Sequence, residues 1–219
     1  MTKNNPYKLN LFSKYSTHSI ILSNIGENKT VLDIGCNDGY IGKNSDKSNI
    51  FYGLDFASES IEKAKKNYKD AILYDLNNLE NLPWNIKFNV IVFADVLEHV
   101  LYPEQVIEFF IKKYLAEDGL VIVSLPNVAN WQVRLNLLFG KFDYTETGVM
   151  DKTHLHLYTS KSARKLVLRN NLKIIKELSG SSFFGSVVKI FPFLKYILAT
   201  NIILICEKIN KNDKKRIIK

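Results

Sequence analysis

Short runs of apolar, often β-branched residues alternate along the first 125 residues with segments in which apolar residues recur every three or four positions. The short runs predict buried β-strands, and the longer spacing predicts helices. Strands are expected at Thr30–Ile34, Ile50–Leu54, Ala71–Tyr74, Phe88–Phe93 and Leu120–Leu125. Helices are expected at Ser58–Tyr68, with Ser58 as its N-cap, and at Pro103–Leu115. This alternation predicts an α/β fold with a parallel, doubly wound sheet that binds ligands beyond the carboxyl ends of its strands.

The pattern changes after Leu125. Residues 126–158 lack strand character, and the helical rhythm in "NWQVRLNLLFGKF" ends at Gly140, so we expect a lid inserted after the fifth strand. The elements predicted beyond the lid are a helix at Ser160–Arg169, a strand near Leu172–Leu178, a helical stretch around Val187–Leu198 and a strand at Asn201–Cys206. We expect a single domain over residues 1–219, with a basic tail at about residues 209–219.

The segment "FFGSVVKIFPFLKYILA", residues 183–199, allows two interpretations. We expect it to pack as a helix and turn between the last two strands. The alternative is a peripheral membrane contact, in which Phe and Leu face lipid while Lys189 and Lys195 face head groups.

Composition narrows the class of protein. With 219 residues and 46% hydrophobic content, the chain is long enough for one buried core. Its apolar runs are far shorter than the ~20 residues of a membrane span, and the polar "MTKNNPYKLN" lacks a signal-peptide core, so we expect a cytoplasmic location. Cys36 and Cys206 have no metal-type spacing. The net charge of +8 is spread along the chain and densest in the tail, which argues against a nucleic-acid partner.

The stretch "VLDIGCNDG" joins the first strand to the next helix. The strand ends in Asp33, and Gly35 and Gly39 frame a turn to which a ligand could lie close. Asn37 stands between them and is among the few residues that tolerate a left-handed backbone. The turn lacks both the G-x-G-x-x-G spacing and the G-K-[ST] ending, so pyrophosphate binding is not favoured.

Three predicted strands end in acidic residues, namely Asp33, Asp55 and Asp75. A carboxylate at such a position can accept both hydroxyls of a ribose, and it attracts an ammonium group but repels phosphate. The ordered series therefore suits a ligand with ribose, adenine amino and amino-acid ammonium donors. S-adenosylmethionine is such a ligand, and we expect it as the cofactor.

Five segments carry a family resemblance. In order and spacing, "VLDIGCNDG", "YGLD", "LYDLNN", "FNVIVFADVLEHV" and "LAEDGLVIVSLPN" resemble the motifs of class I S-adenosylmethionine-dependent methyltransferases. The following segment, "LPNVANWQVRLNLLFGKFDYTETGVMDKTHLHLYTSKSA", is similar to that of a bacterial methionine-biosynthesis-W-like or ubiquinone-methyltransferase-like group. The resemblance implies a Rossmann-like sheet of seven strands, with order 3-2-1-4-5-7-6 and strand 7 antiparallel.

The resemblance also implies which residues hold the cofactor. These positions follow the first four strands and are Asp33, Gly35, Asn37, Gly39, Asp55, Phe56, Asp75, Leu76, Ala94 and Asp95. Those after the first strand would form a wall around the methionine moiety, with Asn37 in place of a frequent glycine. Asp55 would bind the ribose and Phe56 would lie beside the adenine. The positions after the third strand would recognise the adenine edge, and those after the fourth would form the floor near the sulfonium.

Methyl transfer from a sulfonium requires a positioned acceptor and, for a hydroxyl, removal of its proton. No N-P-P-[YF] tetrapeptide follows the fourth strand, and "ADVLEH" suits an oxygen acceptor. The expected catalytic residues are His99, His154 and Asp95, and hydrogen bonding within its turn is an equal alternative for His99. Of the alternating His154 and His156, we expect His154 to face inward. Asp151 is interpreted as a loop-turn acid rather than a catalytic one.

The lid contains candidates for an acceptor pocket. Trp131 and Tyr144, with Phe142, can pack against a sugar or an aromatic ring, and Arg134 can bind an anionic group. The alternative is that these side chains simply form the core of the lid.

A metal site is a second possibility for the loop after the fourth strand. Asp95, Glu98 and His99 can share one face of a helical turn, and with His154 they offer ligands for Mn²⁺, Fe²⁺, Co²⁺ or Zn²⁺. The turn resembles the Glu-x-x-Glu-His turn through which small-RNA 3′-end 2′-O-methyltransferases ligate a metal, with Asp95 in place of the first Glu. We favour the metal-free alternative, in which His99 or His154 is the general base.

The sequence thus predicts an S-adenosylmethionine-dependent methyltransferase that acts on a small or glycan-linked hydroxyl acceptor. Two alternatives stay open. One is a non-catalytic cofactor-binding or scaffold protein of the same fold, and the other is an RNA 2′-O-methyltransferase, suggested by the basic charge.

Overall fold

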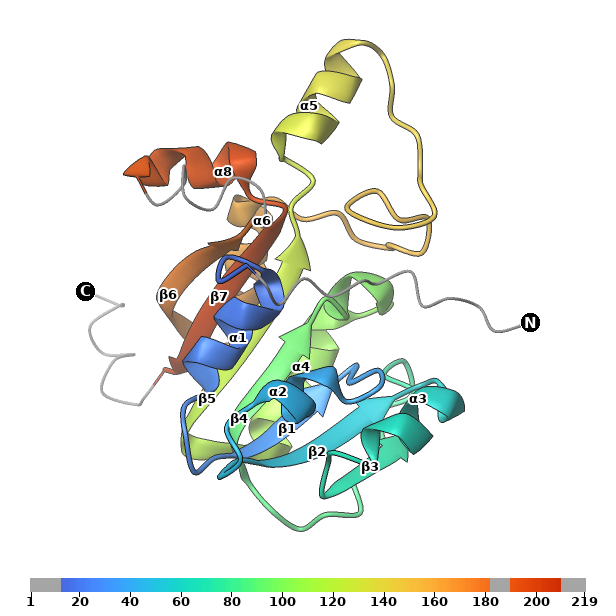
Figure 1. Cartoon of the computed structure of the whole chain (residues 1–219), viewed down its shortest axis with the longest axis vertical. Helices are drawn as coiled ribbons and strands as arrows, with labels where there is room; N and C mark the ends of the chain where they lie inside the picture. The colour runs from blue at the N-terminus through green and yellow to red at the C-terminus, as the bar shows by residue number, and fades with distance from the viewer. Residues whose placement is uncertain (1–12, 182–189, 210–219) are drawn as a thin grey trace.

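A seven-stranded sheet forms the centre of the molecule in the computed structural model, which describes residues 13–181 and 190–209 (Figure 1). The strand order is β3-β2-β1-β4-β5-β7-β6. Neighbouring strands among β1 to β5 pair in parallel, whereas β7 is antiparallel to both β5 and β6. The predicted α/β fold, the strand order and the antiparallel strand 7 are therefore confirmed.

The elements follow the predicted order closely. The strands are β1 Thr30–Ile34, β2 Ile50–Asp55, β3 Asp70–Leu73, β4 Phe88–Ala94, β5 Leu115–Pro126, β6 Leu172–Gly180 and β7 Asn201–Lys208. The helices are α1 Thr17–Ile25, α2 Tyr40–Asn44, α3 Ser58–Ala64, α4 Pro103–Tyr114, α5 Trp131–Leu138, α6 Ser160–Arg169 and α8 Lys195–Leu198. Two 3-10 turns, η1 Leu97–His99 and η2 Pro192–Leu194, complete the described elements.

Both faces of the sheet are covered, as the near-continuous apolar strands predict. On one face Leu32 and Ile34 belong to the core that contains α4 and α6. On the other face Val31 packs with buried residues of α1, α2 and α3, among them Ile21 and Ile61. Because side chains alternate along a strand, Asp33 lies on the same face as Val31.

The start of α3 differs from the prediction. Ser58 is not the N-cap; Ala57 occupies that position without a side-chain capping bond. The side chain of Asp55 supplies the missing acceptor, because its Oδ1 accepts a hydrogen bond from the backbone N–H of Ala57 (2.9 Å). The helix also ends at Ala64 rather than at Tyr68, whose ring turns into the core.

The lid extends from the carboxyl end of β5. Figure 1 shows α5 standing away from the sheet. The returning chain reaches η1, where Leu155 and His156 donate backbone hydrogen bonds to Glu98. Of the residues of α5, Val133 is buried. Isolated bridges between Asn127 and Tyr158, and between Thr145 and Asp151, close the base of the lid and its returning loop. The helical rhythm that the sequence predicts before Gly140 is confirmed.

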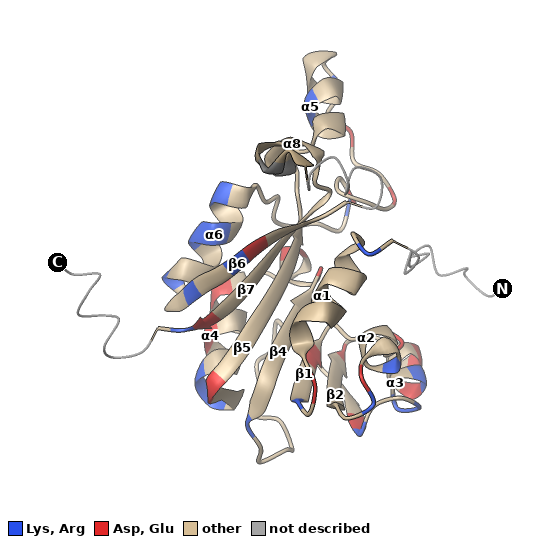
Figure 2. Ribbon diagram, turned by 60° about the vertical axis from the view of Figure 1, so that its left-hand side comes forward, with Lys and Arg blue, Asp and Glu red and all other residues tan. Residues whose placement is uncertain are grey.

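Helix α6 carries several positive charges, which Figure 2 shows in blue. Its basic residues include Lys161, Arg164 and Lys165. Arg164 pairs with Glu177 of β6 (3.0 Å). In the segment 183–199, η2 and α8 come directly before β7, and residues 183–189 lie outside the described residues. The predicted basic tail also lies outside them from residue 210 onward. Within the described part of the chain, no helix has the length and apolarity to span a membrane.

Candidate functional site

Asp55 joins the loops that follow β1 and β2 at the carboxyl edge of the sheet. Its Oδ2 accepts a hydrogen bond from the backbone N–H of Asn37 (2.8 Å), while its Oδ1 accepts from that of Ala57 (2.9 Å). Each carboxylate oxygen has a second lone pair, so Asp55 retains acceptor capacity for ribose hydroxyls. The residue thus fixes two loops and still offers a binding group at the edge.

The turn after β1 requires a left-handed backbone. Gly35, Asn37 and Gly39 have φ of +75°, +46° and +77°, so the interpretation of Asn37 as a left-handed position is confirmed. A Cβ added to Gly35 would lie 2.7 Å from Cγ2 of Val96, and one added to Gly39 would lie 2.8 Å from Cα of Ala64. Glycine is therefore needed both for the backbone conformation and for the close packing of neighbouring chain segments.

Asp33 lies inside the protein at the end of β1, with 1% of its surface exposed. The hydroxyl of Tyr68 donates a hydrogen bond to its Oδ2, while its Oδ1 is buried without a partner among the described residues. Burial, opposed in part by the Tyr68 bond, raises the pKa of Asp33 from 3.8 to about 7. Its predicted contact with the methionine moiety stays a prediction.

Other positions predicted to hold the cofactor range from exposed to half-buried. Phe56 is 83% exposed. Asp75 is exposed and accepts a hydrogen bond from the backbone N–H of Asn77 (2.9 Å), while Leu76 and Ala94 are half-buried. An accessible ring, free carboxylate capacity and a glycine turn of close approach fit a nucleoside-containing cofactor at this edge.

Asp95 occupies the end of β4 with a left-handed backbone, φ +51°. Its Oδ1 accepts hydrogen bonds from Oγ of Ser124 (2.6 Å) and from Nδ2 of Asn201 (2.9 Å). The carboxylate is therefore held by the neighbouring strands β5 and β7. The structure does not group it with the ligand atoms of Glu98, His99 and His154.

The side chains of Glu98, His99 and His154, here called the loop–lid cluster, meet where η1 contacts the returning lid. Their ligand-type atoms all lie within 4.8 Å of one another. The two imidazole rings are in edge-on contact, with centroids 4.8 Å apart. Glu98 is fully buried, and burial together with the nearby Asp95 raises its pKa well above the usual range.

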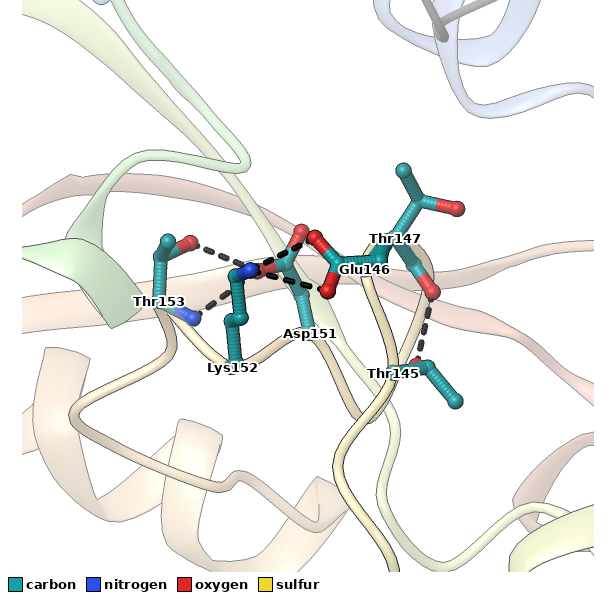
Figure 3. A network of polar contacts seen from close by, with 6 residues as sticks. All are labelled: Thr145, Glu146, Thr147, Asp151, Lys152 and Thr153. Atoms are coloured by element: carbon teal, nitrogen blue, oxygen red, sulfur yellow. Dashed lines mark hydrogen bonds and ion pairs between the residues drawn. The ribbon is translucent and has the colours of Figure 1, made fainter.

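The backbone of the lid fixes the loop–lid cluster. The carbonyl oxygen of Glu98 accepts hydrogen bonds from the backbone N–H groups of Leu155 (2.8 Å) and His156 (3.2 Å). Asp151 accepts from both the backbone N–H and the hydroxyl of Thr153, at 2.8 and 2.7 Å, as Figure 3 shows. Asp151 therefore shapes a turn, as the sequence interpretation expects.

Each imidazole of the cluster has one committed and one available nitrogen. The Nδ1–H of His99 donates to the carbonyl oxygen of Thr153 (3.2 Å), and the Nδ1–H of His154 donates to that of Val149 (3.1 Å). A carbonyl only accepts, so Nδ1 carries the proton in both rings and Nε2 keeps its lone pair. Burial and the nearby His99 lower the pKa of His154, which favours its neutral form.

Other predicted site residues have different surroundings. His156 is half-buried like His154, and its Nε2 lies 3.0 Å from the carbonyl oxygen of Val100, so the expectation that only one of the pair faces inward is not met. Backbone bonds from Leu155 and His156 to the carbonyl oxygen of Glu98 hold this segment against η1. Arg134 donates from Nε to the carbonyl oxygen of Ala129 (2.6 Å).

The aromatic lid candidates lie on the surface. Trp131 is 36% exposed, and Phe142 and Tyr144 are 48% and 56% exposed. The alternative of a lid core is wrong for Phe142 and Tyr144, because both are among the exposed large apolar residues of the described chain. Their contact with an acceptor stays a prediction.

Sequence reasoning missed the residues that orient the site. Tyr68 bonds to Asp33 from a turn 35 positions away, and Ser124 and Asn201 hold Asp95 from two other strands. Thr153 orients His99 across 54 positions. Each of these contacts joins residues far apart in the sequence, so no local sequence pattern predicts it.

This strand order, with its carboxyl-edge site and glycine turn, defines a class I methyltransferase fold. The chain matches a family described as a methyltransferase domain over residues 10–177, and it belongs to that family. The methyltransferase family that the sequence predicts is therefore confirmed.

Two curated relatives are ubiquinone biosynthesis O-methyltransferases. The mitochondrial protein of Candida albicans is 31% identical over 107 residues, which are 45% of this chain and 32% of that protein. The protein of Glaesserella parasuis is 30% identical over 109 residues, which are 45% of this chain and 46% of that protein. The matched region thus spans less than half the length of either relative.

Solved structures share the fold at low identity. A possible histamine N-methyltransferase from Thermotoga maritima has a TM-score of 0.65 at 15% identity, and the match covers 90% of both chains. Magnesium protoporphyrin IX methyltransferase from Synechocystis, solved with bound SAH, has a TM-score of 0.62 at 17% identity, with 88% of this chain and 82% of that one covered.

Proposed function

We propose that this chain transfers a methyl group to an oxygen of a small hydroxylated acceptor. The observation that supports it is the pair His99 and His154, each with Nδ1–H bound to a backbone carbonyl and Nε2 available. The pair lies on the loop after β4 and on the lid above it. The curated relatives, named O-methyltransferases, support oxygen as the acceptor atom.

The methyl donor is proposed to lie along the edge formed by the loops after β1, β2 and β3. Asp55 would accept the ribose hydroxyls, Phe56 would cover the adenine, and Asp75 with the Leu76 backbone would bind the adenine edge. S-adenosylmethionine, when bound, supplies a methyl carbon already activated by its sulfonium. The protein's remaining task is to place the acceptor in line and to handle its proton.

The loop–lid cluster is proposed to handle that proton. A neutral imidazole suits a phenol, with a pKa of about 10, better than the less acidic hydroxyl of a sugar. We therefore place phenols first among the acceptor classes and keep the predicted glycan-linked hydroxyls in the test. Trp131, Arg134 and Tyr144 would contact the acceptor from the lid.

Two measurements test this function. Mass spectrometry of gently purified protein should detect S-adenosylmethionine or S-adenosylhomocysteine carried by the chain. A panel of phenols, sugars and lipid-linked sugars should then give a methyl ether, found by product mass spectrometry, with equimolar S-adenosylhomocysteine. Tight donor binding without any product would favour the non-catalytic alternative, and a methylated nitrogen or carbon would contradict the proposed acceptor atom.

A further inference from the structure

A histidine acting as general base does not explain why Glu98 is buried beside it. Glu98 is 0% exposed, and neither carboxylate oxygen receives a hydrogen bond from another described residue. A buried carboxylate without partners is costly by several kcal/mol, and native proteins almost always satisfy such groups. The position of Glu98 beside two imidazoles indicates what could satisfy it.

The two imidazoles are arranged as metal ligands are. In metal sites a histidine usually donates its second ring N–H to a carbonyl or carboxylate, which fixes the ring and leaves the other nitrogen for the ion. His99 and His154 both do this, toward the carbonyl oxygens of Thr153 and Val149. A general base needs only one imidazole oriented in this way, whereas here two are.

The spacing allows one ion to be shared. Ligand atoms about 2.1 Å from a tetrahedral ion lie about 3.4 Å apart, and those of the cluster lie within 4.8 Å. Side-chain movements of about an ångström or slightly more therefore suffice to bring one ligand atom from each of the three residues onto one ion.

The surrounding charge favours a cation. Asp95 and Asp151 both act on Glu98 as like charges. None of the Lys or Arg ion pairs found among the described residues involves Glu98, Asp95 or Asp151. Three acidic side chains thus gather around two imidazoles with no basic side chain paired to them in this part of the chain.

We infer that Glu98, His99 and His154 bind a divalent transition-metal ion, with positions left open on the ion. One carboxylate and two imidazoles suit Zn²⁺, Co²⁺, Mn²⁺ or Fe²⁺, whereas Mg²⁺ and Ca²⁺ prefer oxygen ligands. Asp95, which the sequence interpretation includes as a fourth ligand, is held by Ser124 and Asn201 instead.

The catalytic meaning of this site rests on the proposed function. An ion here lowers the pKa of an acceptor hydroxyl that occupies an open position, so the hydroxyl proton leaves to solvent. The acceptor oxygen then forms a bond to the methyl carbon, and the electron pair of the broken C–S bond stays on sulfur. His99 and His154 act as ligands in this scheme, which revises their predicted role as direct bases.

Metal binding is measured with Co²⁺ alone, on full-length protein stripped with EDTA and desalted. Wild-type protein should bind one Co²⁺ per chain by calorimetry and develop visible d–d absorption. Glu98→Gln keeps the shape of the side chain, and it should weaken Co²⁺ binding by about 100-fold or more, as should His154→Asn. Circular dichroism and thermal melting establish that each variant is folded.

The matched control is His156→Asn. This half-buried imidazole neighbours the cluster but faces the carbonyl oxygen of Val100, so the variant should bind Co²⁺ as the wild type does. Equal loss in His156→Asn and His154→Asn would overturn the site, as would wild-type protein that binds Co²⁺ no more tightly than Glu98→Gln.

The outcomes separate this inference from the proposed function. Stoichiometric Co²⁺ binding without methyl transfer would support the site and contradict the function. Methyl transfer that survives EDTA, in protein that binds no Co²⁺, would support the function and overturn the site. A folded protein with neither property would overturn both.

Discussion

Two regions of the proposed site are built in different ways: the donor edge, formed by the loops after β1, β2 and β3, and the acceptor side, formed by the loop–lid cluster. The donor edge depends on backbone geometry, with Gly35, Asn37 and Gly39 in left-handed conformations and Asp55 bonded to two backbone N–H groups. The acceptor side depends on side chains brought together from two distant segments, Glu98 and His99 in η1 and His154 in the lid. This difference is what we expect if the sheet edge binds a donor common to the family and the lid adapts the fold to a particular acceptor.

The largest expected effect concerns the buried acid on the donor side. The pKa of Asp33 is about 7 in the fold, against 3.8 ordinarily, because of burial. Protonated Asp33 therefore contributes to the free energy of unfolding in full below about pH 4, and this contribution is lost as the pH rises through about 7. The full difference corresponds to about 4 kcal/mol.

Urea unfolding of cofactor-free protein between pH 4 and 8 checks this. Asp33→Asn should remove most of the decline, since Tyr68 can still donate a hydrogen bond to the amide oxygen. The neighbouring Asp55 also raises the pKa of Asp33, so Asp55→Asn should reduce the decline in part. Identical slopes for wild type and Asp33→Asn would contradict this explanation.

The glycine turn provides the next effect. Gly35→Ala should lower the free energy of unfolding by about 3 kcal/mol, because it adds backbone strain and a collision with Val96. Gly140→Ala is the control, since Gly140 also has a left-handed φ, +71°, but has nothing within 4 Å of an added Cβ. It should cost about 1 kcal/mol. Equal losses of stability in the two variants would show that the close packing of Gly35 against Val96 is not the reason for glycine at this position.

Asp55→Ala tests the donor edge itself. Loss of hydrogen bonds to a carboxylate should weaken S-adenosylmethionine binding by about 2 kcal/mol, or roughly 30-fold, in calorimetry. The folded state should survive with reduced stability, because the N–H groups of Asn37 and Ala57 lose an acceptor. An unchanged dissociation constant would rule out Asp55 as the ribose acceptor.

A smaller effect is expected on the acceptor side at Asp151. This acid bonds to Thr153, whose carbonyl orients His99, so Asp151→Ala should slow methyl transfer by about tenfold and leave donor affinity unchanged. Lys152→Ala removes only an exposed ion pair with Glu146 and should change the rate less than twofold. Loss of donor binding in Asp151→Ala would show that the two sides are not separate.

The same contrast explains what the sequence could predict. Elements defined by local pattern, such as β1 and α6, appear at their predicted bounds, and the left-handed Asn37 is confirmed. Predictions were weaker where a distant group decides the outcome. Asp55 supplies the capping acceptor that Ser58 was expected to provide. Ser124 and Asn201 hold the carboxylate of Asp95, which was expected to be a metal ligand.

The most direct test follows one methyl group in a single turnover. Protein in excess over S-adenosylmethionine labelled in its methyl group is mixed with the acceptor found in the panel, and the rate of ether formation is compared for wild type and His154→Ala. The variant should be at least about 100-fold slower while its donor dissociation constant stays within about twofold of the wild-type value. An unchanged rate, or a loss explained wholly by weaker donor binding, would contradict the role of the loop–lid cluster in oxygen methylation.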